Sequence, residues 1–466
     1  MSLTTAADAP TASRIDETLN ATKDVIFLHL SDIHFRWPKH GRKYELDEDL
    51  RNELQRDART QTDKLGTPTA ILVTGDIAFS ASDDEYKMAT DWLLGDMYQA
   101  TKCPGENICC IPGNHDIDWN AIRKSKSIRD CHEKLRAEQL HLLDGTIQEY
   151  LSDPFVFYRA LESYNKFALQ FGSDLSVEDP YWSRDFSLND TSVLRIRGAN
   201  STLISDEYDD NRTGKLVVLG SHQCTMKNDD GVEHMFLSHH PPQWLIDQDQ
   251  VDRLIHRARI QMFGHKHEQK LNEIDHRLRV AAGAVHPERK ERDWKPRYNW
   301  MSIRVEGEGD HRTLEVTVHP RVWSLDQQCF VPDYEVCLGK EHRSFSLPID
   351  SWTRPAPTAD PSATSPAVSL PSGPAASPDK RDVVQRPFMD PARTLAHRFL
   401  SLPYVRRMEV AQSLKLLRDE DEGIQEAERS KRIFTRAKES RQLAQLWNEV
   451  ERQHGDGKYS TNPFEK

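Results

Sequence analysis

Long hydrophobic runs are missing from this chain of 466 residues. No stretch approaches the roughly 18 uncharged apolar residues that a membrane-spanning helix needs, so the sequence predicts no contact with a membrane. Residues 1–23 are polar and lack the apolar region of a signal peptide. We therefore expect these residues to form a disordered leader and the protein to stay in the cytoplasm.

Paired cysteines and an excess of positive charge are also missing. The seven cysteines show no CxxC spacing, and Cys109 and Cys110 fall within a predicted strand, so we expect reduced, buried thiols rather than disulfides or a zinc site. The 62 basic residues face 74 acidic residues, which gives a formal net charge of -12. This acidic excess excludes a broad, positively charged surface that binds nucleic acids in general. A local basic groove remains compatible with it.

The sequence divides into parts of different composition, as expected for a chain too long for one core. Residues 24–352 alternate buried-strand and helical patterns, which predicts an α/β domain, and residues 120–172 within it predict a helical insertion. Residues 353–385 are rich in Pro, Ala and Ser and predict a linker. Residues 386–466 carry apolar residues at helical spacing among charges, which predicts a small all-α bundle.

Strands at 25–30, at 70–74 and after Asn107 predict a first, mainly parallel sheet. We expect a second sheet from the later strands near 193–197, 216–220, 235–238, 260–263, 278–282, 300–305 and 314–318.

Chemically active side chains follow five of these strands. In chain order they are Asp32 and His34; Asp76; Asn114, His115 and Asp116; His239 and His240; and His265 and His267. Each group alone could be an ordinary polar turn or a structural histidine. Because open α/β sheets place their ligands at the carboxyl ends of strands, the set as a whole predicts a metal site.

Oxygen and imidazole ligands without thiolates suit two adjacent divalent cations such as manganese, iron, zinc or nickel. A carboxylate that bridges both cations offsets their repulsion and holds them about 3.5–4 Å apart. Coordination lowers the pKa of bound water towards about 7 and so supplies hydroxide at neutral pH. The chemistry that this site fits is phosphate ester hydrolysis.

Five blocks, SDIH, GDI, GNHD, SHHPP and GHKH, resemble in this order the signature of the calcineurin-like metallophosphoesterases. The resemblance covers roughly residues 25–318 and implies a four-layer α/β/β/α sandwich with a dinuclear metal site. It implies one metal held by Asp32, His34 and His267, a second held by Asn114, His239 and His265, and Asp76 as the bridge between them.

The same resemblance makes His115 the catalytic histidine, which protonates the leaving oxygen, and we expect Asp116 to orient it by a hydrogen bond. His239 and His240 compete for one ligand position. In similar proteins the first residue beyond the strand is the ligand, which favours His239 and leaves His240 to line the substrate pocket.

The SHHPP and GHKH blocks resemble the branch that contains cyclic-nucleotide and glycerophosphodiester phosphodiesterases, which favours a phosphodiester substrate. Trp37 and Arg42 lie in a loop directly after His34, and are candidates for the substrate pocket. An exposed charged loop is the alternative. With Trp119 and Trp244 just beyond other site loops, we expect a nucleotide or single-stranded nucleic acid as the substrate.

Other functions stay open. The protein could be a phosphomonoesterase or a nuclease, acting as an effector in bacterial conflict and defence and recruited by a protein partner of residues 386–466. It could also bind a phosphorylated ligand without turnover. Because the bridging Asp76 and the catalytic His115 are both present, hydrolysis is the leading hypothesis.

Overall fold

The computed structural model describes residues 24–37, 47–209, 216–287, 294–352, 391–402, 404–421, 426–454 and 462–465. The predicted leader, the predicted linker and Arg42 lie outside these ranges. Among the described residues, no helix is long and apolar enough to cross a membrane.

The first sheet is built around three buried parallel strands, β1 (Val25–Leu30), β2 (Ala70–Thr74) and β3 (Ile108–Ile111). Its order is β12-β11-β10-β1-β2-β3, and β13 pairs with β11. The added strands are β10 (Arg297–Glu306), β11 (Thr313–Ser324), β12 (Cys329–Pro332) and β13 (Arg343–Pro348).

The second sheet has the order β4-β5-β6-β7-β9-β8. Its strands are β4 (Tyr181–Ser187), β5 (Val193–Ala199), β6 (Val232–Ser238), β7 (Ala258–Phe263), β8 (Lys270–Ile274) and β9 (Arg277–Ala281). Two expectations are wrong. The strands near 300–305 and 314–318 return to the first sheet, where β10 pairs antiparallel with β1. The segment 216–220 forms only an isolated bridge between Val217 and Leu245.

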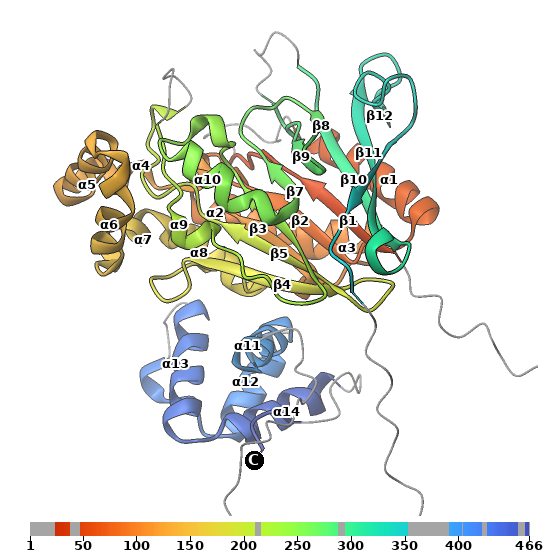
Figure 1. The fold of residues 1–466 in the computed structure, drawn as a ribbon. Helices are drawn as coiled ribbons and strands as arrows, with labels where there is room; N and C mark the ends of the chain where they lie inside the picture. Colours follow the sequence, from red (N-terminus) through yellow and green to blue (C-terminus); the bar gives the residue numbers. More distant parts are fainter. Residues whose placement is uncertain are drawn as a thin grey trace, which may run out of the picture.

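Alternating side chains of the strands explain the four layers of the fold (Figure 1). Met235 and Leu237 of β6 join the core that lies between the two sheets, whereas Phe236 packs against the helices on the outer face of the second sheet. Those helices are α9 (Ser221–Cys224) and α10 (Gln248–Leu254). The first sheet packs with α1 (Glu48–Leu65), α2 (Asp83–Asp91), the π-helical segment Trp92–Met97 and α3 (Tyr98–Thr101).

The predicted insertion is helical. It contains α4 (Trp119–Lys124), α5 (Lys126–Ala137), α6 (Leu140–Leu151), α7 (Pro154–Tyr158) and α8 (Glu162–Ala168). Asp118 and Ser125 cap α4 and α5 by accepting hydrogen bonds from the first free backbone N–H groups of each helix. All seven cysteines are free thiols, and six of them are buried.

The C-terminal helices are α11 (Pro391–Ser401), α12 (Tyr404–Ser413), α13 (Glu426–Glu439) and α14 (Leu443–His454). Their apolar stripes enclose a core of their own, which includes Leu395, Phe399, Val410, Ile433, Leu446 and Trp447. The structure therefore contains the α/β sandwich and the small helical module that the sequence predicts.

Candidate metal centre

The loops after β1 and β2 are joined by backbone hydrogen bonds. The N–H of Asp32 donates to the carbonyl oxygen of Gly75 at 3.0 Å, and the N–H of His34 donates to that of Asp76 at 2.9 Å. The loop after β3 joins them, because the N–H of His115 donates to Oδ1 of Asp76 at 2.9 Å. Three strand ends that are distant in sequence thus present their side chains to one place.

Five of the predicted ligands have a left-handed backbone, which non-glycine residues rarely adopt. Their φ angles are 52° for Asp32, 51° for His34, 51° for Asp76, 71° for His265 and 55° for His267. Such strained positions cluster at functional sites, where the surrounding structure holds them. Here the left-handed turns occur where the chain leaves each strand.

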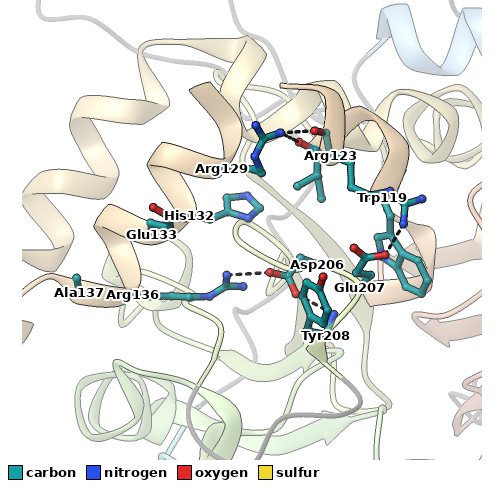
Figure 2. Close-up of a pocket in the computed structure, with 11 residues that line it drawn as sticks. Trp119, Arg123, Arg129, His132, Glu133, Arg136, Ala137, Asp206, Glu207 and Tyr208 are labelled. Atoms are coloured by element: carbon teal, nitrogen blue, oxygen red, sulfur yellow. Dashed lines mark hydrogen bonds and ion pairs between the residues drawn. The ribbon is translucent and has the colours of Figure 1, made fainter. Parts of the chain in front are cut away.

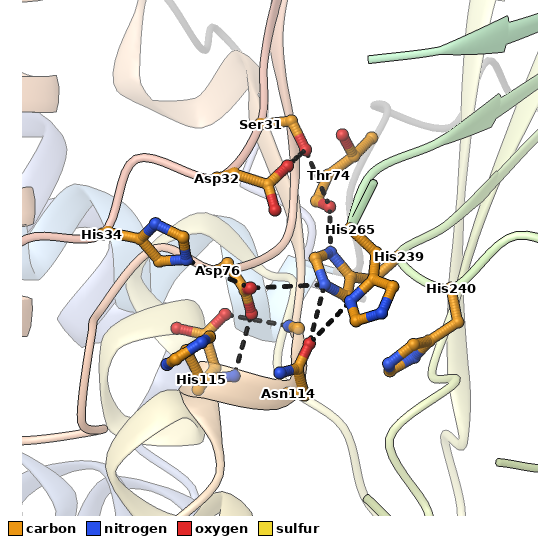
Figure 3. Close-up of polar contacts among 12 residues, drawn as sticks. Ser31, Asp32, His34, Thr74, Asp76, Asn114, His115, His239, His240 and His265 are labelled. Carbon is orange, nitrogen blue, oxygen red and sulfur yellow. Dashed lines mark hydrogen bonds and ion pairs between the residues drawn. The ribbon is translucent and has the colours of Figure 1, made fainter. Parts of the chain in front are cut away.

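Two carboxylates lie among the histidines (Figure 3). Oδ2 of Asp76 is 3.2 Å from Nε2 of His34 and 3.4 Å from Nε2 of His239. Oδ1 of Asp32 is 3.4 Å from Nε2 of His267. The amide oxygen of Asn114 faces two further imidazole nitrogens, His239 Nε2 at 3.1 Å and His265 Nδ1 at 3.0 Å. All seven predicted ligands are therefore brought together.

Main-chain carbonyls orient two of the imidazoles. Nδ1 of His239 donates to the carbonyl oxygen of Thr74 at 2.8 Å, and Nδ1 of His34 donates to that of His286 at 3.3 Å. Because a carbonyl oxygen only accepts, these bonds place the hydrogen of the neutral imidazole on Nδ1, so Nε2 is the nitrogen that would hold a metal. Histidines that ligate metals are oriented in this way.

The charges of the site also fit bound cations. Oδ1 of Asp32 is buried, and none of the residues that the structure describes gives it a hydrogen-bond partner. Burial tends to raise the pKa of this carboxyl, but the interaction with His267 lowers it to about 2. Burial likewise tends to lower the pKa of His239, but Asp76 and Asp32 raise it to about 9. The two ionised carboxylates thus attract positive charge, as expected of a site for divalent metals.

Two glycines allow the loops to approach this closely. A Cβ at Gly113 would lie 2.1 Å from Oδ1 of Asp76. Gly75 has a φ of 93°, and a Cβ there would lie 2.4 Å from Nδ1 of His239. Any side chain at either position would displace a predicted ligand.

His115 lies beside the cluster. Its Nδ1 donates to the carbonyl oxygen of Phe79 at 2.9 Å, and its ring stacks on the Phe79 ring with 5.1 Å between the centroids. Asp116 does not make the expected hydrogen bond to this imidazole. Its buried carboxylate accepts instead from the hydroxyl of Tyr86 and from the backbone N–H groups of Ile77, Ala78 and Gly113. Asp116 therefore fixes the loop that carries His115.

The remaining pocket candidates differ in position. His240 is buried, its Nδ1 lies 2.9 Å from Oγ of Ser201, and its Nε2 has no hydrogen-bond partner among the described residues. The ring of His240 lies 4.6 Å from that of His265. Trp37 is 53% exposed, and the structure does not describe Arg42. Sequence reasoning missed the roles of Thr74 and Phe79, whose main-chain carbonyls carry no sequence signal.

Comparison with protein families gives two matches. The family described as calcineurin-like phosphoesterase matches residues 26–269, and the GTPase-associated adaptor domain matches residues 391–452. Comparison with curated proteins gives no significant match.

Several solved structures are distantly similar. Vacuolar protein sorting 29 of Cryptosporidium parvum shares 12% identity over 70% of this chain and 99% of that chain, with a TM-score of 0.29. A predicted phosphoesterase of Streptococcus pneumoniae shares 9% identity over 70% of this chain and 99% of that chain, with a TM-score of 0.27. A putative 5′-nucleotidase of Staphylococcus aureus shares 11% identity over 71% of this chain and 55% of that chain, with a TM-score of 0.30.

Proposed function

The chain belongs to the calcineurin-like phosphoesterase family, and we propose that it hydrolyses a phosphodiester of the nucleotide type. One relationship carries the proposal: the same oxygen of Asp76, Oδ2, lies 3.2 Å from Nε2 of His34 and 3.4 Å from Nε2 of His239. A carboxylate oxygen shared by two sets of ligands is what a pair of neighbouring cations requires.

The donor set fits two divalent cations, for which we propose manganese, iron, zinc or nickel. The first set is Asp32, His34 and His267, the second is Asn114, His239 and His265, and Asp76 belongs to both. When bound, such a pair supplies hydroxide at neutral pH and offsets negative charge on the phosphoryl group.

In this proposal His115 holds the proton that the leaving oxygen receives. Its Nδ1 donates to the carbonyl of Phe79, so the proton for the leaving oxygen is carried by Nε2 of the imidazolium form. Asp116 and Tyr86 position His115 indirectly, because Asp116 ties together the loops after β2 and β3. His240 lies beside His265 and is available to contact a phosphoryl oxygen through Nε2.

Aromatic rings on both flanks of the site support a substrate that contains a nucleobase. The Trp119 ring lies 5.3 Å from that of His115, and the Trp244 ring lies 4.3 Å from that of His265. Bases stack on such rings irrespective of their sequence. The net charge of -12 disfavours a long polyanion, so a small nucleotide leads, and a phosphomonoesterase or a nuclease is the second candidate.

We further propose that the C-terminal module recruits a protein partner. The match to a GTPase-associated adaptor domain supports a GTPase, or a protein that acts with one, as the class of partner. The separate core of the module supports a unit that binds independently of the hydrolase domain. The seven free thiols favour a reducing compartment such as the cytoplasm.

The test is hydrolysis of a chromogenic phosphodiester and of the matching monoester with manganese added, with Asp76→Asn as the control. Faster hydrolysis of the diester that disappears in the variant supports a phosphodiesterase. Faster hydrolysis of the monoester makes the protein a phosphatase, which contradicts the diester assignment.

A further inference from the structure

None of the predicted metal ligands lines a cavity of about 560 Å³ that the structure contains. Helices α4 and α5 of the insertion form one side, and residues 206–208 form the other (Figure 2). The lining side chains surround a common space, in which His132 lies opposite Asp206 and Tyr208, while Arg129 donates to the carbonyl oxygens of Ile122 and Arg123 in α4. The helical insertion, which provides none of the predicted metal ligands, therefore forms most of the lining of this cavity.

Trp119 connects the cavity to the catalytic loop. It lines the cavity, and its Nε1 donates to the carbonyl oxygen of Asn114 at 3.1 Å. Its ring lies 5.3 Å from the ring of His115. If His115 protonates the leaving oxygen, the group attached to that oxygen departs on the side of Trp119.

The charges of the lining are balanced. Arg123 pairs with Glu207, and Nη1 of Arg136 lies 2.8 Å from Oδ2 of Asp206. Arg129 and Glu133 add one charge of each sign. Burial lowers the pKa of His132 to about 4, so this imidazole is neutral at physiological pH. A wall without net charge does not favour a second phosphate or a polyanion.

Two aromatic rings line the cavity together with these paired charges. Trp119 is half-buried beside the metal centre, and Tyr208 is 49% exposed on the opposite segment. Such a lining suits a ligand group that is neutral and flat and has polar edges. The aromatic side chains stack on the faces of this group, and the paired charged side chains exchange hydrogen bonds with its edges. Among groups that a phosphodiester can carry, a nucleobase has these properties.

We propose that this cavity is the nucleobase subsite of the enzyme, which holds the base of the leaving nucleoside between Trp119 and Tyr208. The inference rests on the proposed function for the position of the scissile phosphate. The recognition of the base needs neither metal nor turnover, so the two ideas can fail separately.

The test measures binding of nucleosides without phosphate, adenosine, guanosine, cytidine and uridine, to the full chain, with ribose as the control ligand. The Asp76→Asn background is used without added metal. We expect saturable binding of at least one nucleoside and none of ribose. Absence of binding by all four nucleosides would overturn the subsite, whatever the activity of the wild type on simple diesters.

Matched variants locate the base. Trp119→Ala is expected to weaken nucleoside binding about 10- to 100-fold, whereas Trp119→Phe keeps an aromatic face and most of the affinity. Tyr208→Ala, at an exposed position that the fold tolerates, is expected to weaken binding as well. Tyr334→Ala is the control, because Tyr334 is an exposed aromatic residue that does not line the cavity. Unchanged binding in both Trp119→Ala and Tyr208→Ala would overturn the assignment.

A protein that binds nucleosides in this pattern but hydrolyses no phosphoester would retain the subsite and refute the proposed function. A protein that hydrolyses simple diesters but binds no nucleoside would support the proposed function and refute the nucleobase subsite.

Discussion

The imidazole Nδ1 of His115 lies 2.9 Å from the carbonyl oxygen of Phe79. Since that oxygen only accepts, Nδ1 carries a hydrogen, and in the imidazolium form Nε2 carries the second hydrogen, which protonates the leaving group. His115→Gln should therefore reduce kcat by about 10²- to 10⁴-fold for a diester with an alcohol leaving group. Nitrophenolate needs no proton to leave, so the loss should be much smaller for a nitrophenyl diester. Equal losses on both substrates would contradict the role as an acid.

The neighbouring histidines of the SHHPP block provide a matched pair for the metal assignment. Nε2 of His239 faces Asn114 and Asp76, whereas His240 is bonded to Ser201. His239→Ala should lose one of two metal ions per chain, and His240→Ala should keep both while its substrate binding weakens. Elemental analysis of the purified variants measures this directly. The reverse pattern would make His240 the ligand.

The meeting of the candidate ligands could be predicted because it follows from a general property of strands, whereas their individual roles rest on the family resemblance. Apolar runs ending in Asp32, Asp76 and Asn114 indicate strand ends at one edge, and the structure brings these residues together. The left-handed φ angles at His34 and His265 were not predictable, because the surrounding loops impose them against local preference.

The partition of the sheets was not predictable from local pattern either. The apolar alternation of β10 indicates a strand but not its neighbour, and β10 pairs with β1, which lies almost the whole domain earlier in sequence. The hydrogen bond from His34 to the carbonyl oxygen of His286 is a second long-range contact that local sequence pattern does not predict. Backbone atoms orient the ligands, and every residue type offers the same backbone atoms.

Asp209 is a buried acid whose titration should destabilise the fold at neutral pH. Burial and the nearby charge of Asp206 raise its pKa from 3.8 to about 7. Between these values the folded state keeps a proton that the unfolded state has released, so the free energy of unfolding falls as pH rises through this window, by about 4 kcal/mol at most. Asp209→Asn should raise Tm at pH 8 and have little effect at pH 4.

The control for this prediction is Asp326→Asn, which makes the same substitution at an exposed position. A gain in Tm from Asp209→Asn that is the same at pH 4 and pH 8 would show that the stabilisation does not come from titration.

Cleavage of the chain between residues 353 and 385 should leave two pieces that fold separately. The residues of the C-terminal core, Leu395 to Val450, form a cluster that shares no member with the core of the sandwich. We expect each purified piece to melt cooperatively within about 5 °C of its transition in the intact chain, since 1 kcal/mol shifts Tm by roughly that amount in a small domain. A helical piece without a cooperative transition would show that it needs the hydrolase domain.

The most direct test of the two-metal site is a titration of metal-stripped protein with manganese, while hydrolysis of a chromogenic phosphodiester is followed. Activity should rise from near zero to a plateau as two equivalents bind per chain. The activity of Asp76→Asn should remain about 100-fold or more below this plateau, because a neutral amide cannot offset the charge of two divalent cations. Full activity without metal, or activity of Asp76→Asn at the wild-type level, would contradict the account.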